Sequence, residues 1–465
     1  MLTPGATRWS LPLPHLRPNP IPPQALVRQL ARSLAAGEAT VEAVVARLTR
    51  TLGKRWRWVP PLANRYVRAF AGKCRPRERQ VVAFLRADAG FQKALAQHGR
   101  ALQIADWQAP PSFVHSQAWQ VPEIATEGEL AAWVGLSVSE LEWLADLKNL
   151  GAKCKEEKLR HYRYRILAKA AGGVRLIEMP KPRLKEIQRR ILDEILAPIP
   201  AHAAAHGFVK GRSIKTFAAP HAGQRVVLRM DLQEFFPRLS RARVQALFRT
   251  AGYPERVAGL LGGLCTNAIP RGIWTHAAPN PGPVAFEPAA LSELRRLYAR
   301  PHLPQGAPTS PALANLCAFR ADCRLHGLAR AAGAHYTRYA DDLAFSGDEE
   351  FESRIARFAA HVAAILGEED LHLNHRKTRV MRQGVRQYLA GVVANRHVNV
   401  VRADFDRLKA TLTNCAHRGP ASQNRENHPA FRQQLAGRVA FVEMINPQKG
   451  ARLRRIFDRI SWSGS

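Results

Sequence analysis

The stretch that decides the fold spans residues 335–347 and reads HYTRYADDLAFSG. Two short runs of β-forming residues flank the Ala-Asp-Asp sequence at 340–342, a pattern that predicts a β-hairpin with two adjacent acids at its tip. An earlier segment, QRVVLRMDLQEFF (224–236), is an apolar run typical of a buried strand, and it delivers Asp231 to the strand's carboxyl end. We therefore expect three carboxylates to meet on neighbouring strands.

Three such carboxylates repel one another unless divalent cations neutralise them. Oxygen ligands select a hard ion, so the pattern predicts Mg²⁺ as cofactor, with Mn²⁺ as a substitute. Two such ions can activate a 3′-hydroxyl and stabilise the pyrophosphate that leaves a nucleoside triphosphate. An isolated Asp-Asp pair in a turn usually serves only local hydrogen bonding and solubility, so the surrounding segments must decide between the two interpretations.

Two further segments favour chemistry on a nucleotide. The stretch LPQGAPTSPALANL (303–316) predicts a glycine-containing turn that opens a small-residue helix, whose backbone can pass close beneath a base pair. A hairpin predicted over 162–179 and the residues just after it carry Lys169, Arg175 and Lys181, which would meet a triphosphate if the hairpin folds over the site. Each of these three bases fits a plain surface cation equally well.

The composition points to a polyanionic partner. The 465 residues include 70 Lys and Arg but only 37 Asp and Glu, a formal net charge of +33 that favours nucleic acid. No apolar run approaches the roughly 20 residues that span a bilayer, and the amino-terminal stretch lacks the order of a secretory signal. The six cysteines form no Cys-x-x-Cys pair, which argues against a zinc ribbon or a disulfide framework. We expect a cytoplasmic protein without a membrane partner.

The first part of the chain predicts a proline-rich tail at 1–23 and an α-helical extension at 24–125. Within the extension, KRWRWVPPLANRYVRAF (54–70) mixes bases with aromatics. It suits either stacking on nucleotides or a helix that buries its Trp and Tyr between solvated Arg residues, and we favour the buried helix. The stretch 129–147 predicts two helices around a turn. Its second helix is acidic, so a packed helical hairpin is favoured over a DNA-reading motif.

The chain resembles the fingers and palm of bacterial reverse transcriptases in seven blocks that occur in the family's order: RLIEMPKPRLKEIQRRI, AAHGFVKGRSI, VVLRMDLQEFF, LPQGAPTSPALANL, RYADDLAFSG, LHLNHRKTRV and QYLAGVVAN. It is most similar to the enzymes of retrons, which copy a cognate structured RNA into a DNA that stays joined to it. Residues 438–462 look like the retron thumb. The resemblance implies an α+β right-hand polymerase with fingers at 126–222, a palm at 223–390 that carries an insertion at about 265–301, and a basic thumb at 391–465.

The resemblance also implies roles for individual residues. It makes Asp231, Asp341 and Asp342 the metal-binding catalytic triad. Phe236 matches the steric gate that clashes with a 2′-hydroxyl and so favours deoxynucleotides. Further matches are Gln305 and Gly306, which contact nucleotide and template, and Lys377, which protonates the departing pyrophosphate.

Two blocks associated with recognition of the cognate RNA depart from the retron pattern. The segment 217–221 keeps Ala218 and His221 but lacks the usual Asn, and Leu-Ala-Gly at 389–391 stands where retron enzymes show Val-Thr-Gly. The resemblance still implies RNA binding by His221. The thumb stretch KGARLRR (449–455) suits a grip on RNA phosphates or a plain solvated face, and we favour the grip. Its basic residues are Lys449, Arg452, Arg454 and Arg455.

We therefore expect an RNA-directed DNA polymerase that uses dNTPs and a structured non-coding RNA as template and partner. The resemblance implies a branched, RNA-linked DNA product primed from a guanosine 2′-hydroxyl, in a system of anti-phage defence. It leaves open whether an effector or toxin protein associates. The alternatives are a defence-associated reverse transcriptase of another clade and a catalytically inert basic RNA-binding scaffold. The presence of all three aspartates argues against the scaffold.

Overall fold

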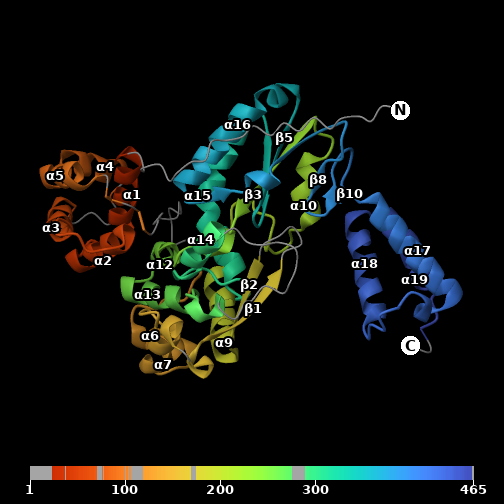
Figure 1. Cartoon of the computed structure of the whole chain (residues 1–465), viewed down its shortest axis with the longest axis horizontal. Helices are drawn as coiled ribbons and strands as arrows, with labels where there is room; N and C mark the ends of the chain where they lie inside the picture. Colours follow the sequence, from red (N-terminus) through yellow and green to blue (C-terminus); the bar gives the residue numbers. More distant parts are fainter. Residues whose placement is uncertain are drawn as a thin grey trace. The chain divides into compact units, whose positions relative to one another are not determined.

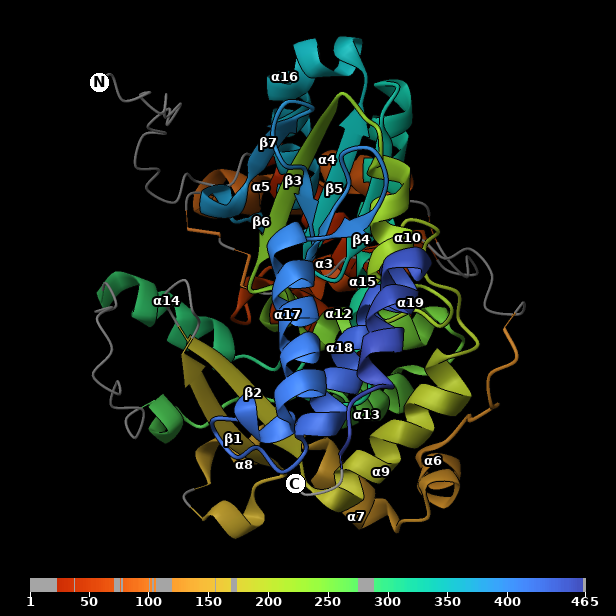
Figure 2. The same cartoon turned by 90° about the vertical axis from the view of Figure 1, so that its right-hand side faces the viewer.

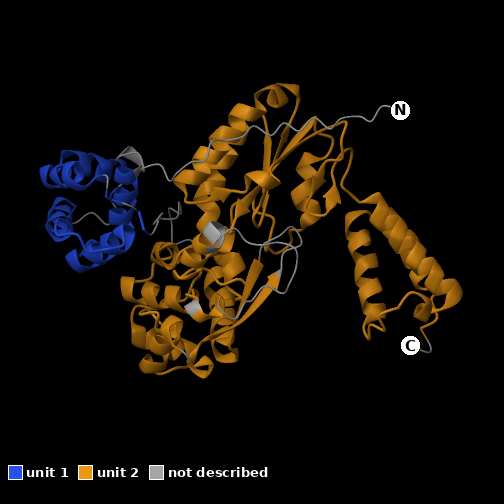
Figure 3. Cartoon of the chain, viewed as in Figure 1, with its two compact units in different colours: residues 1–109 blue, residues 110–465 orange. Residues whose placement is uncertain are grey.

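The computed structural model describes residues 23–36, 38–70, 76, 78–99, 101–102, 104–105, 119–154, 156–168, 174–274 and 288–462. The chain forms two compact units, residues 1–109 and residues 110–465 (Figure 3). Each unit has its own hydrophobic core.

The first unit is a bundle of short helices (Figure 1). Asp88 caps the last of them through the backbone N–H of Phe91 and also pairs with Arg65. Tyr66 is buried in the core and Lys54 and Arg57 are exposed, which agrees with the buried-helix interpretation, but Trp56 and Trp58 precede α3 and are only half-buried. The helices are α1 (Pro23–Ala35), α2 (Val41–Leu52), α3 (Val59–Ala69), α4 (Glu78–Ala87) and α5 (Ala89–His98).

The second unit begins with α6 (Glu127–Val134), α7 (Val138–Ala145) and α8 (Leu150–Lys153). Thr126 and Ser137 start the first two helices with capping boxes, which satisfy backbone N–H groups that a helix leaves unpaired. Both helices pack against α13 (Glu255–Leu264). The prediction of a packed helical hairpin is therefore confirmed.

A two-stranded antiparallel hairpin follows, as predicted, with β1 (Tyr162–Ala168) paired to β2 (Val174–Pro180). The 3-10 helix η2 (Glu157–Leu159) precedes it. Two prolines close to the end of β2 stop the strand, and α9 (Pro182–Arg190) continues into the π-helical turn η3 (Ile191–Leu196).

The central sheet has the strand order β4-β5-β3-β6, and β7 also pairs with β3. Alternate residues of β3 face opposite sides, as the two-residue period of a strand requires. Leu228 and Met230 join the core that includes α12, α15 and α16, whereas Val227 joins the core that includes α10 and the carboxyl-terminal helices (Figure 1). The strands are β3 (Val226–Gln233), β4 (His335–Tyr339), β5 (Asp342–Gly347), β6 (His372–Leu373) and β7 (Arg379–Arg382).

Short and long helices surround this sheet: α10 (Ile214–Ala218), η4 (Ala219–His221), α11 (Phe235–Arg238), α12 (Arg241–Thr250), α15 (Ser310–Ala331), α16 (Glu349–Glu368) and η6 (His375–Lys377). Between α13 and α15, the described part of the expected insertion contains η5 (Arg271–Trp274) and α14 (Pro288–Tyr298). Trp274 and Tyr298 pack with Leu176 of β2 in a separate small core, so α14 lies beside the hairpin (Figures 1 and 2).

The carboxyl-terminal part has a small sheet of β8 (Tyr388–Leu389), β9 (Val392–Val393) and β10 (Asn399–Val400). It leads into α17 (Arg402–Arg418), η7 (Pro420–Ser422), α18 (Phe431–Ile445) and α19 (Pro447–Phe457), the blue helices of Figure 2. Within the described ranges, no helix is both long and apolar enough to cross a bilayer. The mixed helix and sheet content confirms the predicted α+β class.

Candidate active site

The central sheet brings the three predicted aspartates to one place. Asp231 on β3 is the direct cross-strand partner of Asp342 on β5, and such partners have Cα atoms roughly 4.5–5.5 Å apart. The carbonyl oxygen of Asp341 accepts a hydrogen bond from the Leu232 N–H at 2.9 Å. Residues about a hundred positions apart in the sequence therefore become neighbours through strand pairing.

The hairpin tip that carries two of these acids is tightly supported. Ala340 has a φ of 55°, in the left-handed region that residues with a Cβ rarely adopt. Beneath it lies Gly207, where an added Cβ would stand 2.6 Å from the Ala340 nitrogen. A side chain at position 207 would push the tip away, so glycine there lets the tip sit close to the adjacent loop.

Cations compensate two of the three carboxylates. Lys377 Nζ donates to Asp231 Oδ2 at 2.9 Å, and Arg229 Nη2 donates to Asp342 Oδ1 at 2.7 Å. Burial raises the pKa of Asp341 to about 6, and the negative charges of Asp231 and Asp342 add to the effect. Burial also raises the pKa of Asp342, although Arg229 opposes that shift.

The donor set fits a divalent cation, although the side chains are not gathered around one point. Across the described ranges, no three His, Cys, Asp or Glu side chains converge into a ready-made metal site. Asp231 and Asp342 instead point to their cationic partners. Binding of an ion would require these carboxylates to exchange Lys377 and Arg229 for the metal, and it would relieve the unfavourable charge at Asp341.

An aromatic group lies next to the acids. Phe236 is partly buried in α11, and its ring centroid is 6.3 Å from that of Phe208, which is 6.5 Å from that of Tyr339. Phe208 is 53% exposed and has a φ of 61°. Sequence reasoning did not single it out, although the block AAHGFVKGRSI contains it. Its exposed ring and positive φ became apparent only in the fold.

The turn with Gln305 and Gly306 packs against the hairpin strand β2. The Gln305 carbonyl accepts a hydrogen bond from the Glu178 N–H at 2.9 Å. Gly306 has a φ of 133°, and an added Cβ would lie 2.9 Å from the Glu178 carbonyl oxygen. Glycine is therefore required here by backbone conformation and by space.

The predicted bases of the hairpin are placed differently from one another. Lys169 lies outside the described residues. Arg175 is an exposed residue of β2, opposite Leu167 in the register. Lys181 Nζ donates to the carbonyl oxygens of Glu157 and Lys158 at 2.9 and 2.8 Å, so it is bound to η2.

The expectation that His221 binds RNA is wrong for this fold. Its imidazole is fully buried and lies 2.7 Å from both Ser346 Oγ and Thr337 Oγ1. Burial lowers the pKa of His221 to about 3, with smaller contributions from nearby histidines. The ring joins η4 to the two central strands and has no surface to offer RNA.

The four predicted bases of α19 fall into two groups. Arg454 pairs with Glu443 of α18 at 2.7 Å, and Lys449 Nζ lies 5.1 Å from the centre of the Phe405 ring. Both therefore help to hold the helices together. Arg452 and Arg455 are exposed.

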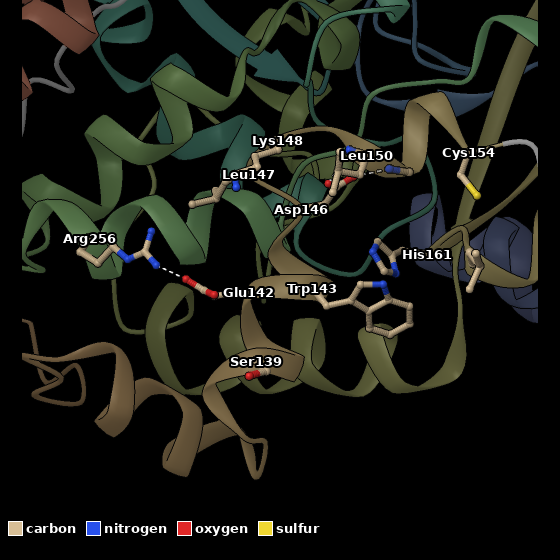
Figure 4. Close-up of a pocket in the computed structure, with 12 residues that line it drawn as sticks. Ser139, Glu142, Trp143, Asp146, Leu147, Lys148, Leu150, Cys154, His161 and Arg256 are labelled. Atoms are coloured by element: carbon tan, nitrogen blue, oxygen red, sulfur yellow. Dashed lines mark hydrogen bonds and ion pairs between the residues drawn. The ribbon is translucent and has the colours of Figure 1, made fainter.

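A separate pocket of about 440 Å³ lies between α7, α8 and the loop before β1 (Figure 4). The rings of Trp143 and His161 lie edge to face on one wall of the pocket, with their centroids 4.5 Å apart. Arg256 forms an ion pair with Glu142 on another wall. None of the predicted catalytic or nucleotide-binding residues lines this pocket. It therefore plays no part in the site built around the aspartates.

Comparison with known proteins agrees with the geometry. Residues 166–393 match the family model described as reverse transcriptase (RNA-dependent DNA polymerase). The retron Mx65 reverse transcriptase of Myxococcus xanthus is 40% identical over 350 residues, which cover 74% of each chain. The retron Mx162 reverse transcriptase of the same organism is 34% identical over 365 residues, covering 75% of this chain and 70% of the relative.

A more distant relative, the retron Ec86 reverse transcriptase of Escherichia coli, is 29% identical over 256 residues, covering 54% of this chain and 69% of the relative. Reverse transcriptases as a class depend on divalent metal ions, and those of retrons make DNA on a non-coding RNA template. The predicted family and enzyme class are confirmed. The chain is an RNA-directed DNA polymerase and belongs to the retron reverse transcriptases.

Proposed function

We propose that this enzyme uses Mg²⁺ and dNTPs to copy a cognate structured RNA, starting from a 2′-hydroxyl of a guanosine in that RNA. The observation that carries the proposal is the direct strand pairing of Asp231 with Asp342, next to Asp341. The product of such priming is a branched DNA that stays joined to its RNA. Since the relatives are named retron enzymes, a retron is favoured over another reverse transcriptase clade.

The three aspartates would hold the metal ions, since β3, β5 and the turn before β5 bring their three carboxylates to neighbouring positions. When bound, Mg²⁺ activates the attacking hydroxyl and stabilises the charge on the leaving pyrophosphate. The side chain of Lys377 is 52% exposed and pairs with Asp231, so an ion that takes its place on Asp231 would leave the ammonium group next to the site. We assign it the proton donated to pyrophosphate.

Phe236 and the turn at 305–306 would select the incoming nucleotide. The ring of Phe236 lies in the short helix that directly follows β3, five residues after Asp231. A ring in this position would clash with a ribose 2′-hydroxyl but accept a deoxyribose. The turn is fixed on β2 by the Gln305 carbonyl, which supports its role in placing nucleotide and template.

The RNA would be held mainly through its phosphates. The net charge of +33 and the exposed Arg452 and Arg455 of α19 support this assignment. We further propose that the RNA-linked DNA serves anti-phage defence, alone or with an effector protein. The support for this last part is family membership.

Nucleic acid that co-purifies with the full chain from its own host tests the proposal. Separate digestion with RNase and DNase, followed by sequencing, should show a DNA whose 5′ end is joined to an internal guanosine of a structured RNA. DNA and RNA without a covalent junction would contradict 2′-hydroxyl priming. An absence of any DNA product would contradict copying of a dedicated RNA.

A further inference from the structure

We propose that Tyr298 and His302, in the segment between α13 and α15, are positioning residues that lock the β1–β2 hairpin and the turn carrying Phe236 into one arrangement. Through this arrangement they set the discrimination between deoxyribonucleotides and ribonucleotides. The inference rests on the proposed gate role of Phe236. It assigns a purpose to a segment for which the sequence offered none.

The network starts at a buried carboxylate on the hairpin. The side chain of Glu178, on β2, is fully buried. One oxygen, Oε1, lies 3.0 Å from His302 Nε2, and the other, Oε2, accepts from Asn267 Nδ2 at 2.7 Å. A buried carboxylate is tolerated only when it is paired and hydrogen-bonded, so the hairpin depends on the segment that supplies both partners.

His302 forms a buried ion pair with this carboxylate. Its Nδ1 lies 2.6 Å from the Arg300 carbonyl oxygen, while Nε2 faces Glu178. Because both ring nitrogens face acceptors, the doubly protonated imidazolium satisfies both, whereas a neutral ring satisfies only one. Burial by itself lowers the pKa of His302, but the charge and hydrogen bond of Glu178 outweigh it and raise the pKa.

Tyr298 extends the network to the gate. The Tyr298 and His302 rings lie edge to face, with their centroids 5.0 Å apart. The Tyr298 hydroxyl donates a hydrogen bond to Glu234 Oε2 at 3.2 Å. Burial and the charge of Glu234 raise the pKa of Tyr298, so the hydroxyl stays a neutral donor. A second residue of α14, Glu293, lies 3.8 Å from Arg238. The segment thus contacts the residue before α11 and the last residue of α11.

Glu234 is the residue directly before α11. It has a φ of 48°, a left-handed conformation that is unfavourable for a residue with a Cβ. Its carbonyl oxygen accepts from the Arg238 N–H at 3.1 Å and so begins the turn that carries Phe236. Loss of the Tyr298 bond would favour relaxation at Glu234 and a shift of the Phe236 ring.

The same network holds the other nucleotide-contacting element, because the main chain of Glu178 binds the Gln305 carbonyl. One path, buried at Glu178, His302 and Tyr298 and half-buried at its two ends, therefore joins both elements. Its members are Gln305, Glu178, His302, Tyr298, Glu234 and Phe236. We therefore expect a shift of the hairpin to displace the Phe236 ring through these contacts.

The test compares Tyr298→Phe with Tyr253→Phe in the full chain. Tyr253 is a buried tyrosine outside the network, and its hydroxyl donates to the Pro122 carbonyl at 3.0 Å. Tyr298→Phe should lower the ratio of kcat/KM for dNTPs over rNTPs by about tenfold, because the gate is less well placed. Tyr253→Phe should leave the ratio unchanged, even if both variants lose similar thermal stability.

Two further variants separate the possible results. His302→Gln keeps an N–H donor towards Glu178 but no charge, and it should shift the ratio in the same direction. If the His302→Gln variant fails to fold, the result for Tyr298→Phe alone tests the proposal. Added to Phe236→Ala, Tyr298→Phe should cause no further loss of discrimination, since the ring it positions is absent.

Equal ratios for Tyr298→Phe and Tyr253→Phe, with discrimination still lost in Phe236→Ala, would overturn the network and leave the gate in place. An unchanged ratio in Phe236→Ala would overturn the gate itself, and this inference with it. The two failures are therefore distinguishable.

Discussion

Asp341 has no cationic hydrogen-bond partner among the described contacts of the three aspartates, whereas Lys377 pairs with Asp231 and Arg229 with Asp342. Burial and two like charges raise the pKa of Asp341 to about 6. Such an arrangement is unfavourable without a cation, and a divalent ion removes the cost. The electrostatics of this one residue therefore favours metal binding.

Replacement of Asp342 tests the metal assignment. Asp342→Asn should lower DNA synthesis by at least about a thousandfold while RNA binding stays within about twofold, because the amide cannot supply the charge that holds the cations. A template-dependent incorporation assay and a filter-binding assay measure the two effects. The control is Asp348→Asn at the cap of α16, where Asn caps as well as Asp. Wild-type synthesis by Asp342→Asn would reject the assignment.

Replacement of Phe236 tests the gate. Phe236→Ala should admit ribonucleotides and lower the dNTP preference by about a hundredfold, because the small side chain leaves room for a 2′-hydroxyl. Single-nucleotide incorporation kinetics with each dNTP and its matching rNTP give the ratio. Phe236→Tyr keeps the ring and should keep the preference. Loss of preference in both variants would point to a general distortion of α11.

His221 should make stability depend on pH. Burial depresses its folded pKa to about 3, whereas the unfolded ring titrates near 6.5. Above pH 6.5 the imidazole is neutral in both the folded and the unfolded protein, so His221 does not lower the free energy of unfolding there. Below pH 6.5 only the unfolded state takes up the proton, and the free energy of unfolding falls by about 1.4 kcal/mol per pH unit.

The variant His221→Gln keeps a donor and an acceptor but cannot titrate. Urea unfolding at pH 7.5 and pH 5.5 should show a smaller acid-induced loss of stability in the variant than in the wild type. An equal loss in both would show that His221 is not held neutral in the folded state.

At the level of elements, the turn before α15 depends on one glycine. The φ of Gly306 and the closeness of the Glu178 carbonyl both exclude a Cβ. This turn is bonded to β2 through the Gln305 carbonyl and leads into α15, so its shape couples the position of the hairpin to that of the helix.

Gly306→Ala should raise the KM for dNTPs by about tenfold and lower stability by roughly 1–3 kcal/mol, since Ala cannot adopt this conformation without strain. Steady-state kinetics and thermal unfolding measure both effects. The matched control is Gly327→Ala in α15, where an added Cβ meets nothing within 4 Å. That change should be neutral or stabilising because Ala favours a helix. Similar behaviour of the two variants would contradict the strained turn.

For the whole molecule, charge is the dominant property. An excess of 33 positive charges favours any polyanion, so RNA affinity is expected to fall steeply with salt. Specific contacts must be identified by a change in that salt dependence rather than by affinity alone.

The double variant Arg452→Ser, Arg455→Ser should reduce the slope of log affinity against log salt by about 2, because two phosphate contacts are lost. RNA binding measured at several salt concentrations gives the slope. The control is Arg354→Ser, Arg357→Ser, which removes the same charge from exposed positions of α16. If both double variants reduce the slope of log affinity against log salt equally, the effect comes from net charge and not from contacts of Arg452 and Arg455 with RNA.

Much of the local structure was predictable because it follows from local pattern. The hairpin over 162–179, the strand ending near Asp231, the turn and helix at 303–316 and the hairpin around 340–342 all occur where apolar alternation and turn residues place them. His221 was misjudged because a single histidine in a short segment between Phe217 and Gly223 does not show from sequence which distant groups cover it. Its two hydroxyl partners lie more than a hundred residues away.

The motifs and their order determined the family, and with it the reaction, because each motif is a short run of chain that can be identified without knowledge of the fold. Tertiary structure alone decided which partners the acids have, where α14 packs, and how Glu178, His302 and Tyr298 join hairpin and gate. The physical reason is that burial and ion pairing depend on contacts between distant segments, and these exist only after β3, β5 and the hairpin have come together.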